Sequence, residues 1–447
     1  MTRLLLPAGA CLALLGPSGA RDDVPPPRNV LILVADDVGV DQIGCYGEGA
    51  LPATTPHIDA LAADGVLFRN AWAAPICSAT RSQIMTGRHG FRTGIGSVVN
   101  GQFALDLDEL TIPEVLDLHP NPPFEHAAFG KWHLGNDDVG GTFAPNLCGW
   151  GHFAGSRGNF KKPEGYYLWT RVENGVERVT DTYATSRIVD DFLAWRSGVR
   201  GRWFAYVAFH SGHFPLHAPP PDLHGVGLPD VEPRFAPVPF YRAMVEAMDA
   251  EIGRLLAGLG DELEETHVIF LGDNGSEPMV SLRPFPPVHA KRTPYEGGLR
   301  VPFIVSGPEV RKPGREVGSL VSAVDVFDTA LTLAGVDLAA LPDPPRRDSV
   351  DLLPYLRDPK REDDPLREYA YQELFFPSGF GAHSIDFRTA RDERYKLIRD
   401  RVRAVDRLYD LVLDPFERRD LLGGELTREE RERYGALSDH IDLHVGE

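Results

Sequence analysis

Short apolar runs recur along the chain. Residues 29–35 (Asn-Val-Leu-Ile-Leu-Val-Ala) are the clearest of them, and a continuous run of this length is typical of a strand buried on both faces. Similar runs occupy residues 126–129, 203–209, 267–271 and 301–305. Stretches with a helical pattern lie between them, at 56–64, 78–85, 182–195 and 240–259. This alternation predicts an α/β fold in which helices flank a large mixed, mostly parallel sheet.

The last part of the chain has a different pattern. A proline-rich junction at 342–345 is followed by strand-like stretches at 388–398 and 408–413. These stretches predict a small C-terminal β-rich subdomain. We therefore expect a main domain over residues 21–345 and a C-terminal subdomain over residues 346–447.

The first twenty residues have the pattern of an export signal. Arg3 supplies a positive charge, residues 4–16 a short apolar region, and Pro-Ser-Gly-Ala at 17–20 a small-residue cleavage site. The apolar region is too short to span a bilayer, and no later segment is long enough. The sequence thus predicts a signal peptide over residues 1–20 and an exported protein, periplasmic or secreted, with no transmembrane anchor.

Composition narrows the class of partner. The 447 residues are 43% hydrophobic and 25% charged, which is ordinary for a globular protein and excludes a disordered chain. The formal net charge of −19 argues against nucleic acid or an anionic membrane as the main partner. A local cluster of cations can still bind an anion inside one cleft.

Cysteine usage is sparse. The chain has four cysteines, Cys11, Cys45, Cys77 and Cys148, too few for a disulfide scaffold and without the spacing of a zinc site. Cys11 lies within the predicted signal. Cys45 and Cys148 either pair or are simply buried, and the sequence leaves both alternatives open.

Polar residues follow the apolar runs directly. Asp36 and Asp37 follow the first run and Asp273 and Asn274 the fourth. Because ligands of open α/β sheets bind beyond the carboxyl ends of the strands, we expect these four side chains to meet. Their oxygen atoms suit a hard cation, calcium or magnesium, and do not suit zinc. A single Asp or Asn after a strand is also typical of a turn or a helix cap. The prediction of a cation site therefore depends on all four residues together.

The most specific local pattern is residues 75–88, Pro-Ile-Cys-Ser-Ala-Thr-Arg-Ser-Gln-Ile-Met-Thr-Gly-Arg. It places Cys77 at a helix start, where free N–H groups and the helix dipole favour an anion. Arg81 is four residues further on, on the same helix face. The alternative interpretation is a buried helix with an inert cysteine.

This stretch resembles the Cys-x-Pro-x-Arg signature of the type I, formylglycine-dependent sulfatases of the alkaline phosphatase superfamily, with Ala79 where the family usually has proline. Other matching motifs occur in the family's order, from about residue 29 to 422. They are Asp36-Asp37, Gly44-Cys45-Tyr46-Gly47, Thr55-Pro56-His57-Ile58-Asp59, Gly130-Lys131-Trp132-His133-Leu134-Gly135, His210-x-x-His213-Phe214-Pro215, Asp273-Asn274-Gly275, Lys291, Tyr295-Glu296-Gly297-Gly298, Tyr395-Lys396-Leu397-Ile398 and Leu408-Tyr409-Asp410-Leu411.

The resemblance implies an arylsulfatase-like hydrolase of sulfate esters. It implies that a formylglycine-generating enzyme oxidises Cys77 to formylglycine, whose hydrated aldehyde is the nucleophile. The implied calcium ligands, with magnesium as the alternative ion, are Asp36, Asp37, Asp273, Asn274 and the modified Cys77.

The resemblance also implies roles for the remaining polar residues. Arg81 would neutralise and orient the nucleophile, Lys131, His133 and Lys291 would hold sulfate oxygens, and His213 would protonate the leaving alkoxide. His210 would orient His213 or bind substrate, and Ser156 would contact substrate.

Two other functions are alternatives to sulfate-ester hydrolysis. A phosphodiester or phosphonate hydrolase of the same superfamily shares the metal face, although the Cys-x-Ala-x-Arg site with Lys131 and His133 favours sulfate and one metal. A non-catalytic binding protein would be expected to lack charged site residues, and the chain keeps them. The expected substrate is a sulfated small molecule or carbohydrate, with loops at 151–162, 215–226 and 375–383 selecting the alcohol.

Overall fold

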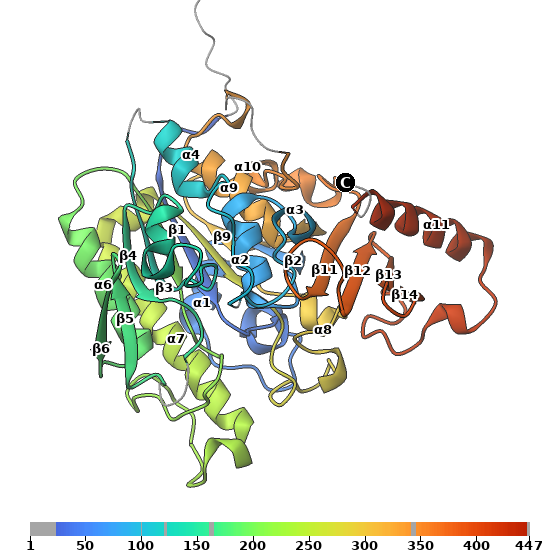
Figure 1. The fold of residues 1–447 in the computed structure, drawn as a ribbon, viewed down its shortest axis with the longest axis horizontal. Helices are drawn as coiled ribbons and strands as arrows, with labels where there is room; N and C mark the ends of the chain where they lie inside the picture. The colour runs from blue at the N-terminus through green and yellow to red at the C-terminus, as the bar shows by residue number, and fades with distance from the viewer. Residues whose placement is uncertain (1–23, 100, 120–122, 161–164, 341–345, 445–447) are drawn as a thin grey trace, which may run out of the picture.

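The computed structural model describes residues 24–99, 101–119, 123–160, 165–340 and 346–444, and it contains two sheets (Figure 1). The larger sheet has ten strands in the order β10-β2-β9-β8-β1-β7-β3-β4-β5-β6. Its central strands β8, β1, β7, β3 and β4 are all parallel. The strands are β1 Asn29–Ala35, β2 Gly65–Trp72, β3 Glu125–Lys131, β4 His152–Ser156, β5 Trp169–Glu173, β6 Val176–Thr180, β7 Trp203–Ala208, β8 Thr266–Gly272, β9 Phe303–Ser306 and β10 Arg315–Ser322.

Helices cover both faces of this sheet, as the alternation of apolar runs and helical stretches predicts. Along β1, Val30, Ile32 and Val34 pack in one core with α2, α4 and α9. The intervening Leu31 and Leu33 pack in the other core with α1, α6 and α7. The helices are α1 Pro56–Ala63, α2 Cys77–Thr86, α3 Gly90–Thr93, α4 Ile112–Leu118, α5 Ala144–Leu147, α6 Ala184–Gly198, α7 Pro237–Leu259, α8 Glu296–Leu299, α9 Val326–Leu333, α10 Leu353–Arg357 and α11 Arg428–Leu443. The predicted fold class is confirmed.

The smaller sheet lies at one side of the molecule (Figure 1). It is antiparallel, in the order β11-β12-β13-β14, with β11 Ala370–Phe376, β12 Ile385–Arg391, β13 Tyr395–Asp400 and β14 Val405–Asp410. Leu437 and Ile441 of α11 pack on Leu397 and Leu408 of this sheet. The β-rich C-terminal unit is therefore present, whereas its predicted boundary at 345 falls on residues 341–345, outside the described residues.

A buried lysine joins the two sheets. Lys396 of β13 is fully buried, and its Nζ lies 3.0 Å from Glu296 Oε1 of α8 and 2.8 Å from Glu417 Oε1. The same ammonium lies over the ring of Trp72 in β2, 4.7 Å from its centroid. The two buried carboxylates thus share the Lys396 ammonium at the contact between the sheets, and Glu296 also lies 3.4 Å from Arg391 Nη1.

Replacing Lys396 with methionine is expected to destabilise the protein by about 3 kcal/mol or more, because it removes the buried charge that pairs with Glu417 and with Glu296 while keeping most of the volume. Urea denaturation followed by circular dichroism measures the effect. The matched control is the exposed Lys360, whose replacement by methionine should cost less than about 0.5 kcal/mol. An equal loss of unfolding free energy in the two variants would contradict a stabilising role for the Lys396 ion pairs.

The predicted signal peptide, residues 1–20, lies outside the described residues. Within the described ranges, no helix combines the length and the apolar character needed to cross a membrane. Cys45 and Cys148 are both free thiols, so they do not pair.

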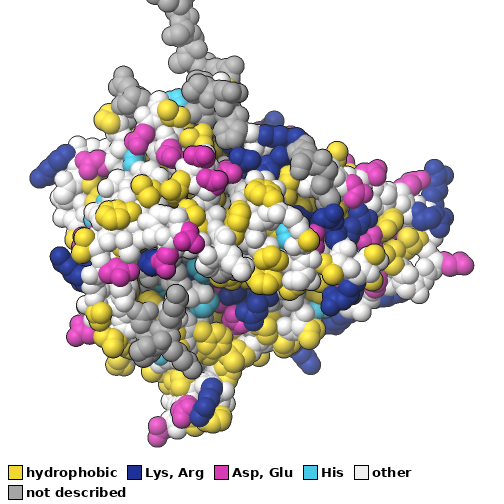
Figure 2. Space-filling model, in the orientation of Figure 1, with side chains coloured by type: hydrophobic (Ala, Val, Ile, Leu, Met, Phe, Trp, Pro, Cys, Tyr) yellow, Lys and Arg dark blue, Asp and Glu magenta, His cyan; other side chains and the backbone are white. Residues whose placement is uncertain are grey.

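The surface shows no separation of charge on the face seen in Figure 2, where basic and acidic side chains are interspersed.

Candidate active site

Four oxygen-bearing side chains meet at the carboxyl ends of two adjacent strands. Asp36 and Asp37 follow β1, and Asp273 and Asn274 follow β8. The parallel register pairs Ala35 with Gly272, so the residues after these two lie side by side. All four side chains are 0% exposed. The structure thus brings together the four residues that the sequence grouped as one cation site.

Three oxygens of this group have no hydrogen-bond partner among the described residues: Asp36 Oδ1, Asp37 Oδ2 and Asn274 Oδ1. The second oxygen of each aspartate is paired. Lys131 Nζ contacts Asp36 Oδ2, and Lys291 Nζ lies 2.5 Å from Asp37 Oδ1. A buried acceptor without a donor is costly, and a hard cation satisfies several such oxygens at once. The donor set therefore fits a calcium or magnesium ion.

The electrostatics of the carboxylates agree with a cation site. Burial, together with the negative charge of Asp36, raises the pKa of Asp273 to about 6, and burial also raises the pKa of Asp36. Burial acts in the same direction on Asp37, but the Lys291 ammonium holds the pKa of Asp37 well below its usual range. Ligand atoms of Asp36, Cys77 and Asp273 lie within 4.8 Å of one another. A bound cation would favour the charged form of these groups.

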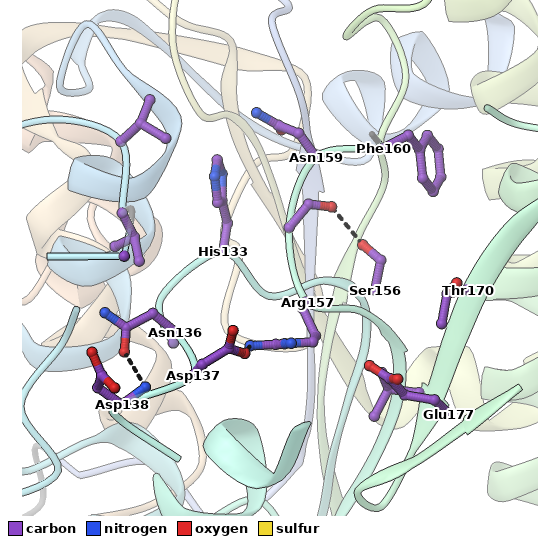
Figure 3. Close-up of a pocket in the computed structure, with 16 residues that line it drawn as sticks. His133, Asn136, Asp137, Asp138, Ser156, Arg157, Asn159, Phe160, Thr170 and Glu177 are labelled. Atoms are coloured by element: carbon purple, nitrogen blue, oxygen red, sulfur yellow. Dashed lines mark hydrogen bonds and ion pairs between the residues drawn. The ribbon is translucent and has the colours of Figure 1, made fainter. Parts of the chain in front are cut away.

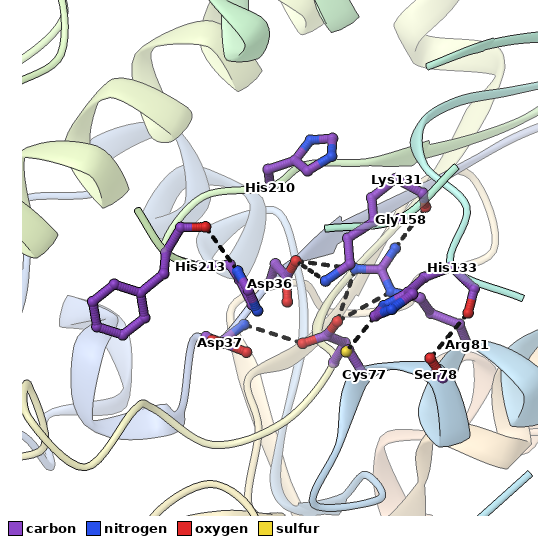
Figure 4. A network of polar contacts seen from close by, with 12 residues as sticks. Asp36, Asp37, Cys77, Ser78, Arg81, Lys131, His133, Gly158, His210 and His213 are labelled. Carbon is purple, nitrogen blue, oxygen red and sulfur yellow. Dashed lines mark hydrogen bonds and ion pairs between the residues drawn. The ribbon is translucent and has the colours of Figure 1, made fainter. Parts of the chain in front are cut away.

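Cys77 is the first residue of α2 and is 1% exposed. The preceding Ile76 has extended backbone angles (φ −155°, ψ 140°), so the chain enters the helix directly from an extended segment. Cys77 Sγ lies 3.3 Å from His133 Nδ1 (Figure 4). Burial raises the pKa of the Cys77 thiol, so an unmodified thiol is protonated at neutral pH and is a weak nucleophile.

Arg81 connects the helix to the cation site. Its Nη2 lies 2.7 Å from Asp273 Oδ2 and 3.8 Å from Asp36 Oδ2, and its Nη1 donates to the carbonyl of Lys131 at 2.8 Å. Arg81 is 0% exposed. Its spacing of four residues from Cys77 places both side chains on the same side of α2, facing the sheet.

Lys131 and His133 come from the end of β3. Gly130 has φ 83° and lies so close to β7 that a Cβ there would be 2.0 Å from the carbonyl oxygen of Ala208, so only glycine fits. His133 has φ 62°, a left-handed backbone that turns the chain beside Cys77. Burial, with the charge of Lys131, lowers the pKa of His133 well below its usual value, so this imidazole is neutral.

His210 and His213 both follow β7 but make different contacts. His213 Nδ1 donates to the carbonyl of Phe214 at 2.9 Å, which leaves Nε2 without that proton. Burial lowers the pKa of His213 to about 4, opposed by the nearby Asp37. His210 is 2% exposed and contacts Ser156 Oγ through Nε2 at 2.7 Å. Figure 4 shows His213 toward Asp37 and His210 further from the cluster.

A cavity of about 860 Å³ adjoins these residues (Figure 3). His133 and Ser156 line it, together with Val98, Val99 and Gly101 and with the loop at 135–138. The sequence had pointed to the loop at 151–162, of which residues 156–160 line the cavity. It had not pointed to Val98, Val99 and Gly101 or to residues 135–138. Gly135, the last residue of the motif at 130–135, was the available signal for the loop at 135–138.

A buried cysteine at a helix start thus lies beside four clustered oxygen-bearing side chains and three converging cations, Arg81, Lys131 and Lys291. A family model described as Sulfatase matches residues 28–336, and one described as N-sulphoglucosamine sulphohydrolase, C-terminal, matches residues 287–434. The chain belongs to the sulfatase family, the type I sulfatases of the alkaline phosphatase superfamily, and is a sulfuric ester hydrolase.

Two relatives illustrate the match. Arylsulfatase A of Homo sapiens is 30% identical, with 93% of this chain and 87% of that protein covered. N-acetylgalactosamine-6-sulfatase of Canis lupus familiaris is also 30% identical, with 82% of this chain and 72% of that protein covered.

Solved structures share the fold. A protein in complex with its substrate D-glucosamine-2-N,6-O-disulfate has a TM-score of 0.72 at 20% identity, and the match covers 94% of this chain and 99% of that one. A phosphonate monoester hydrolase of Agrobacterium radiobacter has a TM-score of 0.69 at 20% identity, covering 94% of this chain and 96% of that one.

Proposed function

We propose that the protein hydrolyses sulfate esters through a formylglycine formed from Cys77, with one divalent cation beside it. The observation that carries the proposal is the position of Cys77, at the start of α2 and within 4.8 Å of ligand atoms of Asp36 and Asp273. The raised pKa of the thiol argues against an unmodified cysteine as nucleophile. One hydroxyl of the hydrated aldehyde would attack sulfur as the S–O bond to the alcohol breaks; loss of the proton from the second hydroxyl would then re-form the aldehyde as the C–O bond to sulfate breaks.

We propose Asp36, Asp37, Asp273 and Asn274 as the protein's cation ligands, with the oxygen of the modified residue 77 beside them. The three unpaired oxygens support this ligand set. Calcium is the proposed ion, with magnesium as the alternative, because both prefer oxygen ligands. When bound, the cation would offset negative charge on a sulfate oxygen.

The remaining residues would bind and orient the sulfate. Lys131 and Lys291 are buried cations directed at the two aspartates, and together with the neutral His133 they can hold sulfate oxygens as charge develops. Arg81 fixes Asp273 and the backbone of Lys131, and its charge would stabilise the nucleophile.

His213 is the proposed acid for the leaving alcohol. Its Nδ1 is held by the carbonyl of Phe214, so Nε2 is the atom available to carry the transferred proton. In the free protein the lowered pKa keeps this imidazole neutral at pH 7. The negative charge of a bound sulfate ester would favour the protonated form, so the proton would be taken up with the substrate.

Replacing His213 with alanine is expected to lower turnover of a sugar sulfate by about 10²-fold or more and of 4-nitrophenyl sulfate distinctly less, because a poor alkoxide leaving group needs protonation and an activated phenol does not. Replacing Lys131 with alanine should lower both by a similar factor, since it weakens sulfate stabilisation instead. Initial rates of the His213→Ala and Lys131→Ala variants on both substrates distinguish proton donation from sulfate binding. Equal losses for His213→Ala on both substrates would show that it does not donate the proton.

A second candidate function is hydrolysis of phosphodiesters or phosphonates. The fold shared with the phosphonate monoester hydrolase supports it, because a cation site with converging lysines also suits a phosphoryl group. A rate comparison across aryl and sugar sulfates, phosphate monoesters and diesters, and a phosphonate monoester distinguishes the two. If the protein is a sulfatase in function, it hydrolyses the sulfate esters at the highest rates of the set.

We propose sulfated sugars as the natural substrates of an exported enzyme. Relatives named for sulfated sugars, an N-acetylgalactosamine-6-sulfatase and a protein in complex with its glucosamine disulfate substrate, support this class. The cavity beside His133 has room for an alcohol of that size.

A further inference from the structure

Arg292 is a cation at the edge of the polar cluster, and it has no role in the sulfate binding proposed above. It directly follows Lys291, and its backbone N–H donates at 2.9 Å to the carbonyl of Pro75, two residues before Cys77. The Arg292 side chain is 50% exposed, whereas that of Lys291 is 3% exposed. Arg292 therefore lies beside the segment that carries the nucleophile and faces solvent, from which a substrate arrives.

Glu277 holds the Arg292 guanidinium in place. Nη1 of Arg292 donates to Glu277 Oε1 at 2.7 Å and Nη2 donates to Oε2 at 2.8 Å. A bidentate pair of this kind fixes both the position and the plane of the guanidinium. The Glu277 side chain is 8% exposed, and its Oε1 also lies 3.3 Å from Lys291 Nζ. One buried carboxylate oxygen thus contacts both Arg292 and the lysine proposed to hold a sulfate oxygen.

Part of the Arg292 guanidinium remains available to a ligand. The group has five N–H donors, of which Glu277 accepts two. The other three have no partner among the described residues. The hydrogen bonds to Glu277, and in addition the charge of Asp37, raise the pKa of Arg292, so it stays a cation. A fixed planar cation with free N–H groups suits a sulfate or a carboxylate.

The backbone of Arg292 also singles out this side chain. Its φ is 68°, in the left-handed region that glycine adopts most easily. For a residue with a side chain this conformation costs about 1 kcal/mol or more, and such residues are concentrated at functional sites. A long charged side chain at a position that suits glycine therefore indicates a use for that side chain.

The cavity on the other side of the site has the opposite charge. Its lining residues follow β3 and β4, whereas Arg292 lies between β8 and β9, beyond β1 in the strand order. Among the described lining residues, the exposed carboxylates of Asp137, Asp138 and Glu177 face one arginine, Arg157, which is paired with Asp137. A negatively charged substituent is therefore disfavoured at the cavity and favoured at Arg292.

We propose that Arg292 is a specificity-determining residue that binds a second anionic group, a sulfate or a carboxylate, on the alcohol of the substrate. This inference rests on the proposed function, since it concerns the alcohol of the same sulfate ester. The buried cations Lys131 and Lys291 hold the sulfate that is transferred, and the half-exposed Arg292 holds the second negative group. The substrates are then sulfated sugars that carry another negative charge close to the ester.

A merely structural role for Arg292 would have a different consequence. If Arg292 only neutralised Glu277, its loss would leave Glu277 to pair with Lys291 and would lower the hydrolysis of every sulfate ester by the same factor. If Arg292 binds a second anion, its loss affects only substrates that carry one. Pairs of substrates that differ in a single charge separate the two roles.

The test uses the full-length enzyme and two matched pairs of substrates, with 4-nitrophenyl sulfate as a reference. The first pair is glucosamine-2-N,6-O-disulfate and N-acetylglucosamine 6-sulfate, which differ in a second sulfate. The second pair is N-acetylgalactosamine 6-sulfate linked to glucuronic acid or to glucose, which differ in a carboxylate. Initial rates of sulfate release give kcat and KM for each substrate.

Three variants change the side chain of Arg292. Arg292→Gln removes the charge, Arg292→Gly removes the side chain while suiting the left-handed backbone, and Arg292→Lys keeps the charge without the planar fork. The matched control is Arg254→Gln. Arg254 is 41% exposed, and its Nε lies 2.6 Å from Oε2 of Glu251, whose side chain is 4% exposed.

We expect the wild type to prefer the more negative member of at least one pair by about tenfold in kcat/KM, since a hydrogen bond to a charged group is worth that much. Arg292→Gln and Arg292→Gly should both abolish this preference, mainly through KM, and should leave the less negative member within about twofold of the wild type. Arg292→Lys should keep part of the preference, and Arg254→Gln all of it. The pair that shows the preference identifies the second group as a sulfate or a carboxylate.

A wild type that prefers the more negative member of neither pair would overturn the inference. Equal losses on both members of a pair in Arg292→Gln and Arg292→Gly would also overturn it, as would hydrolysis of 4-nitrophenyl sulfate and of none of the sugar sulfates. A wild-type enzyme, with residue 77 shown to be formylglycine, that hydrolyses no sulfate ester would instead refute the proposed function.

Discussion

Replacing Cys77 with alanine is expected to lower sulfate-ester hydrolysis by about 10⁴-fold or more, because it removes the atom from which the nucleophile is formed. Cys77 lies at the centre of the polar cluster, 3.3 Å from His133, and no other cysteine of the described residues lies there. Initial rates on 4-nitrophenyl sulfate measure the loss. The matched control is Cys148→Ala, which removes a buried free thiol that is not part of the cluster.

The same experiment has a chemical counterpart. Mass spectrometry of the peptide that contains residue 77, from protein coexpressed with a formylglycine-generating enzyme, should find formylglycine in at least part of the molecules. Ala79 stands where the motif usually has proline. The fraction of formylglycine therefore measures how efficiently the modifying enzyme recognises the motif with alanine at this position. A fully active preparation with only unmodified Cys77 would refute the proposed nucleophile.

Replacing Asp37 with alanine or asparagine is expected to abolish binding of one divalent cation per chain and to lower turnover by about 10³-fold or more. Asp37 Oδ2 is one of the three unpaired oxygens, whereas Oδ1 is held by Lys291. Metal analysis of the purified chain and initial rates measure the two effects. Undiminished turnover after exhaustive chelation, with the metal shown to be absent, would refute the cation site.

Thermal unfolding gives a readout that does not depend on activity. A cation that binds only the folded protein stabilises it by about 2.7 kcal/mol at a hundredfold excess over its dissociation constant. Calcium should therefore raise the Tm of the wild type and leave that of Asp37→Asn unchanged. Asp41→Asn is the control, because Asp41 is also buried but is hydrogen-bonded to Gln42 and Ser276. It should keep the calcium response.

Several elements were predictable because their local pattern is strong. β1 and β8 are continuous apolar runs that become fully buried central strands, and α7 is a long amphipathic helix. The strands β5 and β6 were missed; they come last in the strand order, and β6 is the edge strand. Four of the five residues of β6 are exposed, so its sequence Val-Glu-Arg-Val-Thr lacks an apolar run. β2 was missed because Arg69 and Asn70 interrupt its apolar pattern.

The sequence by itself determined the α/β class and the family, and it supplied the residues that we propose for the chemistry, because periodicity and motif spacing are local properties of the chain. Only the tertiary structure decided which of those residues touch. Asp37 and Asp273 are 236 positions apart, and their contact exists because β1 lies between β7 and β8 in the sheet. The pairing of Lys131 with Asp36, the three unpaired oxygens and the His210–Ser156 contact follow from this strand order, since neighbours across a parallel sheet are set by topology and register.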